Sequence, residues 1–140
     1  MKLETYLFFD GDCAAAFDFY KSVFGGDFAM RSTFAEGPPE MGVAEDEKDC
    51  IMHVSLPVGD SVLMGSDVSS SHGPVPARGE NFAISIAPDS REAADKIFAR
   101  LSEGGETVMP MADAFWGAYF GMCKDKFGIK WMINFETPRA

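Results

Sequence analysis

The sequence has little cysteine, little histidine and few basic residues, and each shortage excludes a class of protein. Three of its 140 residues are cysteines, and their odd number and wide spacing predict neither a disulfide framework nor a CxxC zinc or redox site. Twelve Lys and Arg against 22 Asp and Glu give a net charge of -10, which is the wrong sign for binding nucleic acid. No run of 18 consecutive apolar residues occurs, so neither a membrane-spanning helix nor a membrane partner is expected.

The N-terminus and the acidic residues refine this picture. The first residues, MKLETYLFFDGD, have one Lys and a short apolar run that ends in acids, unlike a secretory signal peptide, so we expect a cytoplasmic protein. Six acids against one Lys lie in residues 36–49. This segment predicts a solvated loop, and the alternative is a rim that attracts cationic ligands.

Two halves of the chain repeat one pattern of predicted elements. In the first half, the predicted helix covers residues 13–24 and the predicted strands cover 3–9, 27–35, 50–57 and 61–65. In the second half, a helix capped by Asp89 runs to about Glu103, and the predicted strands cover 81–87, 107–113, 118–124 and 129–135. Asp12 is the predicted N-cap of the first helix, and a Gly-Gly pair ends each helix. The halves therefore read as one repeated βαβββ unit.

This repeat predicts the fold class and the domain organisation. With 46% hydrophobic residues, including 13 Phe and nine Met, the chain can bury a core. Residues 67–80 are rich in Ser, Pro and Gly and lack periodicity, which is typical of a linker. We therefore expect a single α+β domain over residues 1–140. Its first module covers about 1–66 and its second about 81–140.

Four motifs of the sequence are specific when taken together. They are FDFYKSVFGG at residues 17–26, IMH at 51–53 with GDSVLMGSD at 59–67, FWGAYFG at 115–121, and DKFGIKW at 125–131. The first resembles the first-helix signature of the vicinal oxygen chelate superfamily, which includes glyoxalase I, bleomycin-resistance proteins and extradiol dioxygenases. The others resemble its PhnB-like branch. The resemblance covers nearly the whole chain.

The resemblance implies a particular architecture and chemistry. Two βαβββ modules would form a cup-shaped mixed sheet, with the helices on the convex face and the ligand on the concave face. Members commonly form homodimers, so a second copy of this chain is the expected partner. Enzymes of the superfamily hold one divalent metal in the cup, where it acts as a Lewis acid on vicinal oxygens of the substrate.

The metal ligands of the superfamily do not occur in this sequence. Aligned on the motifs, the four ligand positions, which are His, Gln or Glu in the superfamily, fall on Thr5, Met64, Phe82 and Met132. None of these side chains is a usual ligand for a divalent ion of this kind. A shift of one residue brings Glu4 or Asn81 to one position, but it cannot restore four ligands. We therefore expect neither the metal nor another cofactor.

Strand alternation instead predicts an apolar, methionine-lined pocket on the concave face. The residues predicted to line it are Thr5, Leu7, His53, Ser55, Val62, Met64, Phe82, Ile84, Trp116, Tyr119 and Met132. A small apolar or cationic ligand is the expected occupant. The alternative is a cavity filled by its own side chains or by a dimer partner.

His53 is the candidate catalytic residue, because it lies in the middle of an apolar strand. If Met52 and Val54 pack on the helices, His53 faces the cup, where it can act as a general base or as a hydrogen-bond partner of a ligand. The alternative is a half-buried imidazole satisfied by a backbone group. Cys13 begins a helix but has no His near it in the sequence, so we expect a structural thiol.

Three functions remain open from the sequence. The first is a small-molecule-binding protein of the glyoxalase and bleomycin-resistance type that lacks the metal site. The second is a metal-dependent lyase, isomerase or dioxygenase with ligands rearranged around His53 and Glu4. The third is a dimeric structural or interaction module that uses Phe115, Trp116 and Tyr119.

Overall fold

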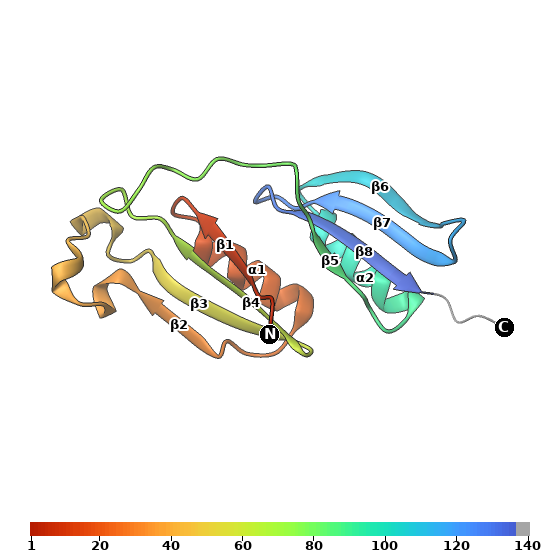
Figure 1. The fold of residues 1–140 in the computed structure, drawn as a ribbon, viewed down its shortest axis with the longest axis horizontal. Helices are drawn as coiled ribbons and strands as arrows, with labels where there is room; N and C mark the ends of the chain where they lie inside the picture. The colour runs from red at the N-terminus through yellow and green to blue at the C-terminus, as the bar shows by residue number, and fades with distance from the viewer. Residues whose placement is uncertain (137–140) are drawn as a thin grey trace. The chain divides into compact units, whose positions relative to one another are not determined.

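The computed structural model describes residues 1–136 and divides the chain into two compact units. The first unit is Met1–Ala77, and the second begins at Arg78. Each contains one four-stranded sheet and one long helix (Figure 1). The predicted α+β class with two βαβββ modules is therefore confirmed. A cup formed jointly by the two sheets stays a prediction, as does the division of one domain at residues 67–80.

The first module is a mixed sheet with α1 (Cys13–Phe24) across one face (Figure 1). Its strands are β1 (Thr5–Phe9), β2 (Met30–Thr33), β3 (Ile51–Val58) and β4 (Ser61–Asp67). Their order is β1-β4-β3-β2, with β1 parallel to β4 and the other pairs antiparallel. The parallel pair is joined through α1 and the intervening strands, as a crossover connection requires.

The second module repeats this topology. Its elements are β5 (Ile84–Ile86), α2 (Arg91–Ser102), β6 (Glu106–Asp113), β7 (Ala118–Lys124) and β8 (Lys130–Glu136). The strand order is β5-β8-β7-β6, and β5 is parallel to β8. No helix among the described residues is long and apolar enough to cross a membrane.

The apolar face of α1 forms the core of the first module. Its buried residues are Cys13, Ala16, Phe17 and Tyr20, which recur at helical spacing. The Phe17 ring lies so close to Gly65 of β4 that a Cβ at Gly65 would come within 2.7 Å of it. Glycine at this position therefore allows the helix to approach the sheet.

The predicted N-cap position is confirmed for α1 but not for α2. Asp12 is the N-cap residue of α1, but its side chain makes no capping hydrogen bond. The carboxylate of Asp67, at the end of β4, accepts instead from the backbone N–H groups of Gly11 at 2.8 Å and Cys13 at 3.0 Å. In α2 the predicted cap was one residue too early, because the hydroxyl of Ser90 accepts from the N–H of Ala93 at 3.0 Å.

The acidic segment consists of short turns and no regular strand. Three 3-10 helices, η1 (Phe34–Glu36), η2 (Pro39–Met41) and η3 (Glu45–Glu47), lie between β2 and β3. Most of the acids are exposed, but the Glu47 carboxylate accepts hydrogen bonds from both the N–H and the hydroxyl of Ser70. The pKa of Glu47 is lowered mainly by these bonds. The segment is thus attached to residues that the sequence predicts to be a linker.

Candidate functional site

Strand pairing separates the two faces of the first-module sheet. Leu7 pairs with Gly65, which faces Phe17 of α1, so Leu7 also lies on the α1 side. The neighbouring pair, Tyr6 and Met64, therefore points to the opposite side. We call this opposite side the distal face. It carries Tyr6, Phe8, His53, Ser55, Val62, Met64 and Ser66.

The face predicted for β1 is wrong. Leu7 is only 5% exposed, within the core on the α1 side, and Thr5 shares that side of the strand. Tyr6 and Phe8 take their places on the distal face, where Phe8 is 57% exposed. The sequence could not decide between the two registers, because both alternating sets in TYLFF are rich in apolar residues.

A tyrosine–histidine pair is the main polar feature of the distal face. The hydroxyl oxygen of Tyr6 lies 3.0 Å from Nδ1 of His53, and the two rings are stacked with centroids 5.6 Å apart. The Tyr6 ring also contacts Phe8 at 5.1 Å between centroids. The imidazole is therefore partnered by a side chain, not by the backbone group of the alternative interpretation. Tyr6 is the functional candidate that the sequence analysis missed.

The other predicted residues of the first module lie near this pair. Ser55 of β3 pairs with Met64 of β4, and Met64 pairs with Tyr6 of β1. Val62 lies two residues before Met64 and so shares its face. The structure therefore brings His53, Ser55, Val62 and Met64 together on one surface.

The predicted residues of the second module separate between its two faces. Ile84 pairs with Trp131, a residue that is 1% exposed and lies on the α2 side of β8. Ile84 therefore also faces α2, and its predicted place on the concave side is wrong. Met132 pairs with Met122 on the side away from α2. Phe82 precedes β5, and 56% of its surface is exposed.

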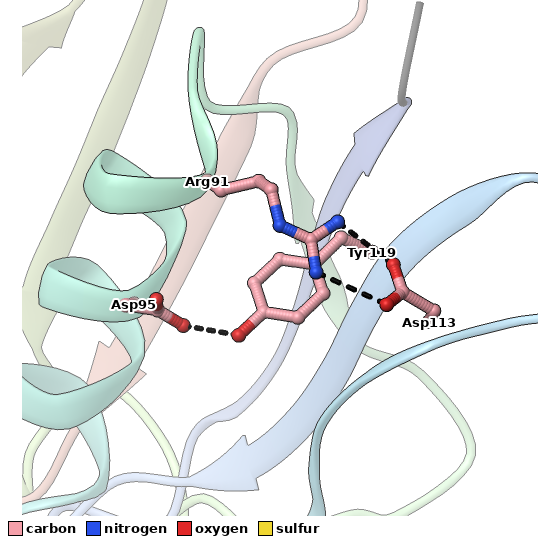
Figure 2. Close-up of polar contacts among 4 residues, drawn as sticks. All are labelled: Arg91, Asp95, Asp113 and Tyr119. Carbon is pink, nitrogen blue, oxygen red and sulfur yellow. Dashed lines mark hydrogen bonds and ion pairs between the residues drawn. The ribbon is translucent and has the colours of Figure 1, made fainter.

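Tyr119 lies on the α2 side of its sheet, which corrects its predicted place in the pocket. Its hydroxyl donates to the carboxylate of Asp95 on α2 at 2.5 Å (Figure 2). The guanidinium of Arg91 lies 4.0 Å from the Tyr119 ring centroid and donates twice to Asp113 of β6, at 2.7 and 3.1 Å. We call these four side chains the Arg91 network. The bond to Asp95 raises the pKa of Tyr119, and the bonds to Arg91 lower the pKa of Asp113.

The other aromatic residues near Tyr119 are in the turn between β6 and β7. Phe115 is 97% exposed and Trp116 is 51% exposed. Trp116 makes edge-on contacts with Phe115 and with Phe120, at 5.1 and 5.8 Å between centroids. Of the three aromatic residues predicted to form an interaction surface, Phe115 and Trp116 contact each other, whereas Tyr119 belongs to the Arg91 network.

The side chains present do not fit the divalent metal of the superfamily. Among residues 1–136, no group of three or more His, Cys, Asp and Glu is placed to hold an ion. At the aligned positions, Thr5 lies on the α1 side, Phe82 is a hydrocarbon ring, and Met64 and Met132 offer thioethers. If the alignment is shifted by one residue, Tyr6 takes the first ligand position in place of Thr5. Tyr6 offers neither a carboxylate nor an imidazole, so the four side chains remain unsuited to the ion.

The three thiols are also unsuited to nucleophilic chemistry. Cys13 and Cys123 are fully buried, and burial raises the pKa of each thiol, to about 11 for Cys123. The pKa of Cys50 is raised as well, again mainly by loss of solvent. A thiol with a raised pKa carries little thiolate at neutral pH. The expectation of a structural Cys13 agrees with these environments.

Comparison with known proteins supports the fold and the family. Protein YjdN of Escherichia coli (strain K12) is 28% identical over 144 residues, which cover 96% of this chain and 95% of that protein. The crystal structure of protein PA1353 from Pseudomonas aeruginosa is 37% identical, with a TM-score of 0.85 and 99% of each chain covered.

A further similar structure supports the fold. The structure described as a putative 3-demethylubiquinone-9 3-methyltransferase, PhnB protein, from Bacillus cereus is 22% identical with a TM-score of 0.76, and 96% of this chain and 99% of that one are covered. At this identity the likeness shows a shared fold. The family model of the Glyoxalase/Bleomycin resistance protein/Dioxygenase superfamily matches residues 2–133, so the chain belongs to that superfamily, as its motifs predict.

Proposed function

We propose that this protein binds a small organic molecule on the distal face of its first module, without the divalent metal of the superfamily. The observation that carries the proposal is the hydrogen-bonded pair of Tyr6 and His53, set among apolar side chains. Ligand sites combine apolar side chains with a few placed polar groups, and this face offers both kinds.

The surroundings of the pair favour an aromatic or otherwise apolar ligand. Phe8 offers an exposed ring beside Tyr6, and Met64 lies next to Tyr6 across the β1–β4 pair. Methionine adapts its shape to irregular ligands and interacts well with aromatic rings. Ser55, which is half-buried, supplies a further hydroxyl group on the same face.

The donor set supports binding without a metal. A site for a divalent ion needs several carboxylate or imidazole ligands, and the distal face offers one imidazole. The competing hypothesis uses His53 and Glu4 as rearranged ligands of a metal-dependent enzyme. Glu4 precedes β1 and forms an ion pair with Lys2 at 3.4 Å.

A thermal-unfolding panel tests the absence of a metal. A ligand at a hundredfold excess over its dissociation constant stabilises the native state by about 2.7 kcal/mol, which shifts the midpoint by several degrees. We expect no shift with nickel, zinc, manganese, cobalt or iron(II), with or without chelator. A shift from one metal that chelator reverses and His53→Ala abolishes would establish the competing enzyme hypothesis.

The same assay tests ligand binding on the distal face. Aromatic and aliphatic compounds that raise the midpoint of the native protein are expected to lose this effect in His53→Ala and in Met64→Ala. His72→Ala is the matched control, because His72 is an exposed histidine outside the strands of the distal face, and its ring hydrogen-bonds with the carbonyl of Met41. Compounds that stabilise both distal-face variants as well as the native protein would place the binding site elsewhere.

Association with a second copy is a separate proposal, favoured by the exposure of Phe115 and Trp116. Large exposed aromatic side chains that contact each other are typical of interaction surfaces. Sedimentation velocity over a range of concentrations is expected to show a dimer that Trp116→Ser weakens. A monomer at every concentration would refute it.

A further inference from the structure

We infer that His53 recognises an oxygen acceptor on the ligand, such as a carbonyl or carboxylate oxygen, by donating from Nε2. This inference rests on the proposed function and specifies its ligand class. It follows from the partner of the other imidazole nitrogen, which is the hydroxyl of Tyr6 at 3.0 Å.

The Tyr6 hydroxyl fixes the tautomer of His53. A phenol donates its proton readily and accepts weakly, because its lone pair is delocalised into the ring, whereas an unprotonated imidazole nitrogen accepts well. Tyr6 therefore donates to Nδ1, and the proton of the neutral ring lies on Nε2. In the protonated ring both nitrogens carry protons. Nε2 is thus a donor in either state.

The Nε2 donor is available to a ligand. Among residues 1–77, no group forms a hydrogen bond with this nitrogen. No buried side-chain nitrogen or oxygen of the described residues lacks a hydrogen-bond partner, so the unpartnered Nε2 is accessible to solvent. His53 itself is half-buried, which limits competition from water around the donor.

The direction of the donor is also restrained. The imidazole stacks on the Tyr6 ring with an interplanar angle of 23°, and Tyr6 in turn contacts Phe8. Phe8 and Met64 lie on the same face as the pair, where they can contact the apolar part of such a ligand. Preorganised donors cost less to immobilise on binding, so this arrangement favours one orientation of the ligand.

The first experiment reads the tautomer without any ligand. Long-range proton–nitrogen NMR correlations of ¹⁵N-labelled protein distinguish a protonated from an unprotonated ring nitrogen. We expect His53 to show protonated Nε2 and unprotonated Nδ1, and Tyr6→Phe to perturb the Nδ1 signal. A neutral ring with its proton on Nδ1 would overturn the inference, whereas the proposed binding face does not depend on this tautomer.

The second experiment compares acetophenone with ethylbenzene, which differ in the carbonyl oxygen, by NMR titration of the native protein. One hydrogen bond contributes about 1 kcal/mol, so acetophenone is expected to bind about fivefold more tightly. The ratio should fall to about one in His53→Phe, which keeps an aromatic ring but has no donor. Benzoate, titrated in parallel, shows whether a carboxylate is preferred over a carbonyl.

The outcomes separate the inference from the function on which it rests. Equal binding of acetophenone and ethylbenzene at the distal face would support the proposed site and overturn the donor role of His53. A carbonyl preference that persists in His53→Phe would also overturn it. No shift of the distal-face signals with any probe up to its solubility limit would overturn the proposed function itself.

Discussion

The two modules share strand order, strand directions and the position of the helix, yet different interactions hold each helix on its sheet. Four residues of α1 are buried, and they include Phe17 and Tyr20. Only Ala94 and Leu101 are buried in α2, which is instead linked to β6 and β7 by the Arg91 network (Figure 2). The comparison teaches that the βαβββ topology tolerates both an apolar and a partly polar attachment of its helix.

Each module also has a buried carboxylate, Asp67 in the first and Asp125 in the second, and the two connect segments at different distances along the chain. Asp67 accepts from Gly11, Cys13 and Ile51, which brings the start of α1 and the start of β3 to the end of β4. Asp125 accepts from the backbone of Phe127 and Ile129 and from the indole of Trp131, all within six residues. Asp67 therefore connects distant segments, whereas Asp125 fixes one turn.

The sheet faces away from the helices also differ. In the first module this face carries the Tyr6–His53 pair, and in the second it carries Phe120, Met122 and Met132. A duplicated fold has thus placed a stacked, hydrogen-bonded tyrosine–histidine pair on this face of its first half, whereas Phe120 and two methionines occupy the same face of the second. This asymmetry is the reason for assigning the ligand to the first module.

The largest effect is expected from removing the ring that fills the α1 interface. Phe17→Ala deletes a fully buried side chain, and such changes cost about 3–5 kcal/mol of unfolding free energy. Phe98→Ala on α2 is the matched change, and the smaller burial of Phe98 predicts a loss of about half that size. Urea denaturation measures both. Equal losses would show that apolar packing holds α2 as firmly as α1.

The second largest effect is expected at the buried carboxylates. Asp67→Ala leaves three backbone donors without their acceptor, two of them buried, and we expect a loss of about 3 kcal/mol. Asp125→Ala should cost less, since a single turn can rearrange to expose its donors to water. Native-state hydrogen exchange at Gly11 and Ile51 should accelerate only in the Asp67 variant. Acceleration in both variants would contradict the distinction between distant and local connections.

A smaller effect is expected in alkali from the Arg91 network. The pKa of Tyr119 is raised above its ordinary value of 10.0 in the folded state. The stability that it contributes is therefore fully present below pH 10 and is lost as the pH rises through the higher folded value. The difference in melting temperature between the native protein and Tyr119→Phe should shrink in that range. A difference that does not change with pH would rule out the bond to Asp95 as its source.

The smallest effect is expected in acid, at the ion pair of the same network. Arg91 lowers the pKa of Asp113 below its ordinary value of 3.8. The contribution is thus present above pH 3.8 and is lost as the pH falls through the lower folded value. Asp113→Asn should destabilise slightly at neutral pH, and added salt should reduce the effect because the pair is exposed. Melting temperatures at two salt concentrations measure this, and salt independence would contradict it.

The sequence predicted elements best where local signals agreed. The bounds of α1 and β7 matched the predicted ones, and in α1 the helical spacing of apolar residues and the glycines that follow pointed to the same limits. The strand expected at 27–35 was shortened to Met30–Thr33, since the chain enters η1 at Phe34. The strand expected at 81–87 was reduced to Ile84–Ile86. Strand ends depend on which neighbour is available for pairing, and that information is not local.

The candidate site was predicted only in part for a related reason. His53 and Ser55 share one face of β3, as the alternation of that strand predicts, and Met64 of β4 pairs with Ser55 on the same face. In β1 the choice between Leu7 and Tyr6 could not be made from the strand alone, since either set can be buried. The packing of Phe17 against Gly65 decides it, because Leu7 must then share the α1 side.

By itself, then, the amino-acid sequence determined the repeated βαβββ units, the family and the residue types that replace the metal ligands. These depend on periodicity, turn residues and side-chain chemistry, which are properties of short segments. Only the tertiary structure decided that Asp67 caps α1, that Tyr119 lies on the α2 side and that Tyr6 is the partner of His53. Each of these contacts joins residues far apart in the chain, and the register of strands and the approach of helices, not local preference, bring them together.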